Sequence, residues 1–136
     1  MIELTLEMAE TSVRAAQAKA RALGTPMTVT VVDEAGRLVL SARGDGTGFL
    51  TPETARAKAV AAVAFRRPTS EMAAQGGQGW GFWQAMPTVV QGQALPTPGG
   101  APIVRGGRVV GGIGCGGGTG EQDQQCADAG AAALSG

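Results

Sequence analysis

The sequence predicts a single α+β domain, in which helices pack on a mostly antiparallel sheet of about five strands. Helical and hairpin patterns alternate along the 136 residues, in the order helix, hairpin, helix, weak strand, hairpin, helix. A chain of this length corresponds to about one domain, and no internal repeat or linker offers a place to divide it. We therefore expect residues 1–136 to fold as one unit.

The strongest local pattern is the glycine-rich segment at residues 95–123. Gly106 and Gly107 lie between two apolar pairs, and a Gly-Gly dipeptide supplies the positive φ angles that a two-residue hairpin turn requires. After further glycines, Thr119 and Gln122 form a capping-box pattern that begins a last helix. The segment therefore predicts a tight hairpin, a glycine-rich exit and a helix start.

The remaining elements are predicted from hydrophobic periodicity and from residues typical of helix starts and turns. Apolar residues recur every three or four positions in residues 5–23, and Thr51-Pro52-Glu53 begins a second helix that runs to about Phe65. Residues 69–75 form a further short helical piece. Residues 27–33 and 37–42 alternate around a turn and predict a first hairpin, and residues 88–94 predict a weak strand that Gly92 interrupts.

The composition limits the classes of partner. Eleven basic and eleven acidic residues cancel and are scattered along the chain, whereas nucleic-acid or membrane-surface partners need a basic patch. The sequence shows no apolar run of membrane-spanning length and no basic export signal. Its two cysteines are too few for a disulfide framework. We therefore expect a cytoplasmic protein without nucleic-acid or membrane partners.

Histidine is absent from the chain, which excludes the Ser-His-Asp, Cys-His and HExxH chemistries. No pair of cysteines or cluster of acids has metal-ligand spacing, so no metal site is expected. Residues 112–117 match the GxGxxG pattern, but no second strand and ribose-binding acid follow. We therefore favour the interpretation that these glycines are small residues that let a helix cross close to a strand.

Five short motifs, in this order and spacing, carry a family resemblance across essentially the whole chain. They are Ala57-Lys58-Ala59 with Ala61-Ala62-Val63-Ala64-Phe65, Arg67-Pro68-Thr69-Ser70, Gly99-Gly100-Ala101-Pro102-Ile103, Val109-Val110-Gly111-Gly112-Ile113-Gly114, and Gly120-Glu121-Gln122-Asp123. The sequence resembles the GlcG/HbpS family, a haem-binding-like domain that is also the C-terminal part of PduO-type proteins.

The resemblance implies a profilin-like antiparallel sheet flanked by helices, and assembly into homo-oligomers from dimers to octamers. It also implies that some members bind haem or a corrinoid-related ligand. Haem binding in the better understood relatives looks histidine-dependent, and this chain has no histidine. Histidine-ligated haem is therefore impossible here, and haem would need Cys115, Cys126, a methionine or a lysine as its ligand.

Without histidine, carboxylates and lysine are the remaining acid-base groups. Glu121 and Asp123 lie in the first turn of the last predicted helix, where they stabilise the helix dipole or face a cleft as acid or base. Lys58 has small neighbours three and four residues away, so it is either a snorkelling lysine or a partly desolvated base.

Six further positions are candidate ligand contacts. Arg43 and Asp45 form either a loop ion pair or a polar pocket rim, and Arg66 either complements the helix dipole or holds an anion. The aromatic segment from Trp80 to Trp83 forms either a subunit contact or a lid over an apolar ligand. Cys115, between glycines at a strand exit, is either reachable or a buried small hydrophobe.

The leading functional hypothesis is a small-molecule-binding protein with a pocket near the glycine-rich strand exit. The alternatives are a cofactor-independent isomerase, lyase or cyclase that acts on a small metabolite, haem binding through a ligand other than histidine, and a purely structural oligomer partner.

Overall fold

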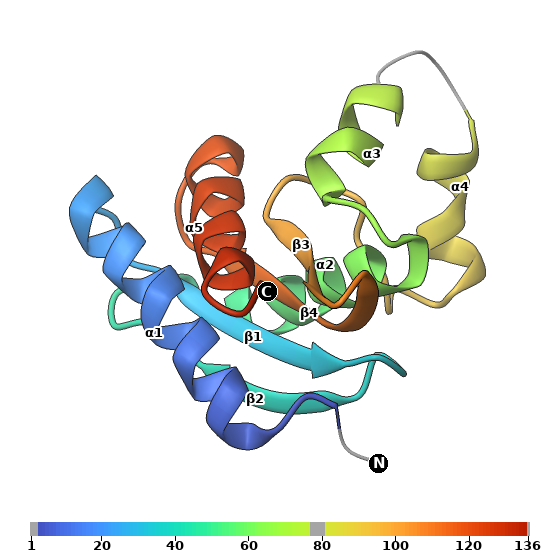
Figure 1. Ribbon diagram of the computed structural model, residues 1–136. Coiled ribbons are helices and arrows are strands. Elements are labelled where there is room, and N and C mark those ends of the chain that lie inside the picture. The colour runs from blue at the N-terminus through green and yellow to red at the C-terminus, as the bar shows by residue number, and fades with distance from the viewer. Residues whose placement is uncertain (1–2, 77–80, 136) are drawn as a thin grey trace.

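The computed structural model describes residues 3–76 and 81–135. Within these residues, five helices and four strands form one layered α+β domain (Figure 1). The elements in chain order are α1 (Leu6–Leu23), β1 (Thr28–Asp33), β2 (Leu38–Ala42), α2 (Thr51–Phe65), α3 (Thr69–Gly76), α4 (Phe82–Val89), β3 (Gly100–Arg105), β4 (Arg108–Gly116) and α5 (Gly120–Ala132).

The sheet is antiparallel throughout, with the strand order β2-β1-β4-β3. Both predicted hairpins are confirmed. In the β3–β4 turn, Gly106 and Gly107 have φ angles of 57° and 78°, as a Gly-Gly turn requires. In the β1–β2 turn, Asp33 Oδ1 accepts hydrogen bonds from the backbone N–H groups of Ala35 and Arg37. The two hairpins join through β1 and β4, which places the glycine-rich strand in the centre of the sheet.

The expected number of about five strands is wrong by one, because residues 88–94 form no strand. Helix α4 extends to Val89, and a turn in which Gln91 and Gly92 have positive φ angles follows it. Trp83, Met86 and Val90 follow a helical spacing and pack in a cluster around Met72, and this packing outweighs the weak strand pattern.

Helices cover both faces of the sheet. Helix α2 packs on β1, β3 and β4 from one side, and α1 and α5 pack against each other and on the strands from the other side (Figure 1). The two-residue period of β1 explains the division. Val29 and Val31 point into the main core beneath α1 and α5, whereas Val32 contacts the cluster beneath α2.

The contact between α2 and β4 depends on glycine. A Cβ atom at Gly114 would collide with the carbonyl oxygen of Ala55, and one at Gly112 would lie 2.7 Å from the carbonyl oxygen of Ala59. The helix backbone therefore rests almost directly on the strand backbone. The expectation that these glycines serve helix–strand packing agrees with this geometry.

We predict that Gly114→Ala lowers the free energy of unfolding by about 3 kcal/mol or more, because the new methyl group must push α2 away from the sheet. The matched control is Gly116→Ala on the same strand, where the nearest atom to a new Cβ is the adaptable hydroxyl of Thr54 at 3.3 Å. Urea unfolding of both variants measures the difference. Equal stabilities would contradict the packing argument.

Candidate functional site

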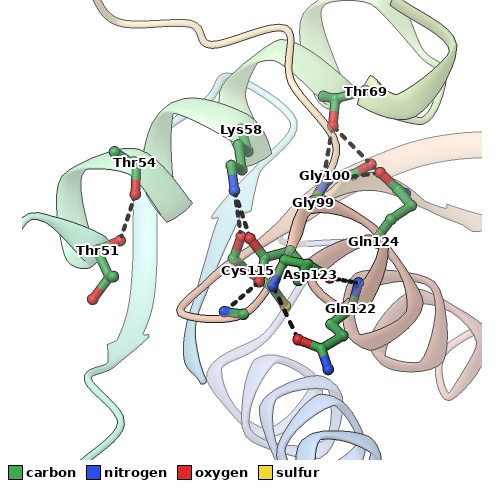
Figure 2. A network of polar contacts seen from close by, with 12 residues as sticks. Thr51, Thr54, Lys58, Thr69, Gly99, Gly100, Cys115, Gln122, Asp123 and Gln124 are labelled. Carbon is green, nitrogen blue, oxygen red and sulfur yellow. Dashed lines mark hydrogen bonds and ion pairs between the residues drawn. The ribbon is translucent and has the colours of Figure 1, made fainter. Parts of the chain in front are cut away.

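The most distinctive polar feature of the described chain is a buried ion pair between Lys58 of α2 and Asp123 of α5. The Lys58 ammonium lies 3.1 Å from Asp123 Oδ2 and donates a second hydrogen bond of 2.9 Å to the carbonyl oxygen of Cys115 (Figure 2). Lys58 is 7% exposed and Asp123 is 4% exposed. The pair therefore connects two helices that lie on opposite faces of the sheet, at the end of β4.

The sequence places Asp123 at this point through the start of α5. Thr119 Oγ1 accepts a hydrogen bond from the backbone N–H of Gln122, and the Gln122 side chain accepts one from the backbone N–H of Thr119. This capping box fixes the first turn of the helix. Asp123 Oδ1 then accepts a 2.9 Å hydrogen bond from the backbone N–H of Gly118, so both carboxylate oxygens have partners.

The start of β3 is held by the same network. Gly99 has a φ angle of 128°, and a Cβ there would lie 2.9 Å from Lys58 Nζ and 2.7 Å from the carbonyl oxygen of Cys115. Gln124 accepts from the backbone N–H of Gly99 and donates to the carbonyl oxygen of Gly100, and Thr69 accepts from the backbone N–H of Gly100. Only glycine at position 99 gives the lysine room.

Sequence reasoning did not single out Gln124 and Thr69 as members of this network. Thr69 lies within one of the family motifs, and Gln124 follows Asp123 directly, so proximity to recognised motifs was the available signal. Their partners are backbone groups of Gly99 and Gly100, which a sequence pattern does not reveal.

Cys115 lies between these groups with its side chain in the main core. Burial raises the pKa of its thiol well above the usual value, and the negative charge of Asp123 acts in the same direction. Burial also raises the pKa of Cys126, which packs inward on α5. Both thiols therefore stay protonated and shielded at neutral pH, which matches the reading of Cys115 as a small hydrophobe.

The other predicted site residues lie apart from this network. Arg43 and Asp45 are exposed on the loop between β2 and α2, and no ion pair joins them. Glu121 is exposed on the first turn of α5, and Arg66 is exposed at the end of α2. Trp80 lies outside the described residues.

Trp83 belongs to an aromatic cluster at the edge of the domain, where α3 and α4 meet the end of α2. Its ring packs edge-on against Phe65 and Phe82, with centroid distances of 4.8 and 5.0 Å, and the guanidinium carbon of Arg67 lies 5.4 Å from its centroid. The indole N–H donates a 2.6 Å hydrogen bond to Gln75. These contacts fix the orientation of the half-buried ring.

Trp83 also lines an open groove between α3, α4 and the segment that precedes β3. The groove has a volume of about 360 Å³. We call it the Trp83 groove. It is lined by Met72, Ala73, Trp83, Gln84, Pro87, Leu95, Pro96 and Thr97.

Other features relevant to function concern metals, membranes and self-association. The described residues contain no cluster of three or more histidine, cysteine or acidic side chains that could hold a metal ion. Among the helices of this part of the chain, none is long and apolar enough to cross a bilayer.

Phe49 and Leu50 are adjacent and exposed, with exposed fractions of 77% and 59%, which is compatible with a subunit contact. Homo-oligomerisation of this chain stays a prediction.

We predict that Asp123→Asn lowers the free energy of unfolding by about 3–5 kcal/mol, because it leaves the Lys58 ammonium buried without a counter-charge. The double variant Lys58→Met/Asp123→Leu removes both charges and should lose less than the single variant. Denaturant unfolding compares them.

The matched control for this prediction is Arg108→Met, which breaks the Arg108–Glu3 ion pair at the surface. That change should cost less than about 1 kcal/mol. If the double variant is less stable than Asp123→Asn, the prediction is contradicted. The ion pair would then stabilise the fold by more than the two buried charges cost.

Comparison with known proteins places this architecture in a family. Residues 4–132 match the model of the family described as haem degrading protein HbpS-like. A 15.0 kDa protein from the dhaT-dhaS intergenic region of Citrobacter freundii is 30% identical over 92% of this chain and 87% of its own.

Two crystal structures show the same fold. A double mutant of Streptomyces reticuli HbpS has a TM-score of 0.85 and 38% identity, with 98% of this chain and 88% of that chain covered. The structure described as a PduOC:heme complex has a TM-score of 0.87 and 30% identity, with 96% and 94% covered. The resemblance in the motifs is thereby confirmed, and the chain belongs to the HbpS-like family.

Proposed function

We propose that this protein binds a small, planar and largely apolar organic molecule in the Trp83 groove, without axial ligation of a metal. The observation that carries the proposal is a half-buried tryptophan whose orientation is fixed by neighbouring rings and which lines an open groove. A ring fixed in this way can contact a planar ligand at little further entropic cost.

The composition of the groove supports this ligand class. Ala73, Pro87 and Leu95 supply apolar walls, and Gln84 and Thr97 place an amide and a hydroxyl beside them. Small-molecule sites typically combine a mostly apolar lining with a few polar groups, in volumes from about 300 Å³ upward. The volume of about 360 Å³ suits one ring system rather than an extended polymer.

A tetrapyrrole is the first ligand class to test, because the chain belongs to the HbpS-like family and a 30% identical neighbour was crystallised as a complex with heme. The lining of the groove does not fit an axially ligated haem, however. It contains no histidine, cysteine or lysine, and the side chain of its one thioether residue, Met72, is completely buried. We therefore infer that apolar contact and stacking hold the ligand.

The proposal predicts that hemin and metal-free protoporphyrin quench Trp83 fluorescence with similar affinities. The measurement uses Trp80→Phe protein, in which Trp83 is the single tryptophan. A Soret band shifted by axial coordination, together with binding of hemin but not of protoporphyrin, would contradict stacking without ligation. Failure of both porphyrins and of smaller planar aromatic molecules to bind would overturn the proposed function.

Within this design, Trp83→Ala should weaken binding by about tenfold or more, because truncating an aromatic contact residue typically costs over 1 kcal/mol. Absorbance titration replaces fluorescence for this variant. The matched control is Val89→Ala on the same helix, because Val89 is exposed and does not line the groove. Equal affinities of the two variants would place the ligand elsewhere.

A second candidate function is proton transfer by Lys58 and Asp123, with Glu121 as a further acid or base. The observation that favours it is the 3.1 Å contact between an amine and a carboxylate inside the glycine-rich end of the sheet. This function predicts that Lys58→Met/Asp123→Leu loses turnover of a true substrate while keeping its melting temperature within a few degrees. Full activity of this variant and of Glu121→Gln would exclude these groups.

A further inference from the structure

The side of α2 that faces the β1–β2 turn carries a second hollow region, separate from the Trp83 groove. One hollow of about 320 Å³ reaches Arg66 and Val109, and another of about 570 Å³ reaches Arg37 and Arg56. The two share Ala35, Gly36 and Val60 and so form one continuous groove between α2 and the β1–β2 turn, which we call the α2 groove. The shared and end residues are Ala35, Gly36, Arg37, Arg56, Val60, Arg66 and Val109.

Three arginines line this groove with free guanidinium groups. Within the described residues, the guanidinium groups of Arg37, Arg56 and Arg66 make no hydrogen bond, ion pair or ring contact, in contrast with Arg67 and Arg108. Two carboxylates, from Glu34 and Glu53, also line the groove and are likewise outside the ion pairs. Positive charge therefore exceeds negative charge by one along the groove.

The distribution of groups along the groove is uneven. Arg66 lies at one end with Val63 and Ala64 beside it, and Arg37 and Arg56 lie at the other end. Val60 is common to both halves. Each half of the groove thus has at least one guanidinium group and one carboxylate, from Glu34 in the first half and Glu53 in the second, and the aliphatic side chain of Val60 lines both.

The backbone of Arg66 adds an independent observation. Arg66 ends α2 in the left-handed conformation, with φ 58° and ψ 39°, a position where glycine is usual and a Cβ atom is strained. The same chain ends α1 with Gly24 at φ 72° and ψ 30°. The end of α2 thus carries an arginine in a conformation where glycine is usual, and this strain adds support to a role for its side chain.

We propose that the α2 groove binds a small organic anion that carries oxyanion groups, carboxylate or phosphate, at two ends of an apolar body. Arg66 pairs with one end, and Arg37 and Arg56 pair with the other. Guanidinium groups suit this chemistry because they bind carboxylate or phosphate oxygens with two parallel hydrogen bonds. The proposal is independent of the porphyrin site, since the two grooves share no lining residue.

Titration calorimetry at low ionic strength tests the proposal with three probes: glutarate and phthalate as dicarboxylates, and inorganic phosphate. We expect saturable binding that weakens as salt is added. Whether the dicarboxylates or phosphate bind more tightly identifies the oxyanion class. Absence of binding of every probe at millimolar concentration would overturn the proposal.

Arg66→Gly separates a binding role from a purely structural role of the helix end. Without anion, glycine relieves the left-handed strain, so the melting temperature should stay equal or rise by a few degrees. The rise in melting temperature on addition of anion should disappear, and affinity should fall about tenfold or more. An anion response equal to that of the unmodified protein would show that Arg66 serves only the helix end.

Two further comparisons complete the test. Arg37→Gln and Arg56→Gln should each lower the affinity for the two-ended probes more than for inorganic phosphate. The matched control is Arg21→Gln, which removes an exposed arginine from the last turn of α1, outside the groove. If this control loses as much affinity as the groove variants, the effect comes from the net charge of the protein. That outcome would contradict a defined site.

Discussion

The structure depends on the close approach of α2 to the glycine-rich strand β4. Glycines 112 and 114 leave no side chain between the helix backbone and the strand backbone. Lys58 can then extend past the end of the sheet to Asp123 at the start of α5, through the space that Gly99 leaves open. Removal of side chains at three positions thus allows one buried ion pair to connect both helical layers, which a wider helix–sheet spacing would prevent.

This arrangement places reactive groups and open surface in different parts of the molecule. The ammonium, the carboxylate and the thiol that lie together are buried and hydrogen-bonded or shielded, whereas the grooves lie along α4 and between α2 and the β1–β2 turn. In the two proposals, ligand recognition at those surfaces depends on an oriented indole ring and on unpaired guanidinium groups. Both kinds of contact work without histidine, which this member of the HbpS-like family lacks.

Much of the fold could be predicted from local patterns. The Gly106-Gly107 turn, the helix at residues 5–23 and the capping box at Thr119 each depend on neighbouring residues, and the structure confirms all three. The weak strand at residues 88–94 was wrong, because burial of Met86 against Met72, far away in sequence, decides the conformation there. The sequence suggested candidate site residues by their chemical type. It could not show that these residues lie in separate parts of the molecule.

The sequence by itself determined the fold class, the family and the absence of imidazole chemistry, since these follow from residue order, spacing and composition. Only the tertiary structure decided that Lys58 pairs with Asp123 across 65 positions, that Cys115 is buried, and that Arg66 lies strained beside a groove. The physical reason is that desolvation and charge pairing depend on distances in space, and those distances are set by how closely glycine lets one layer approach the next.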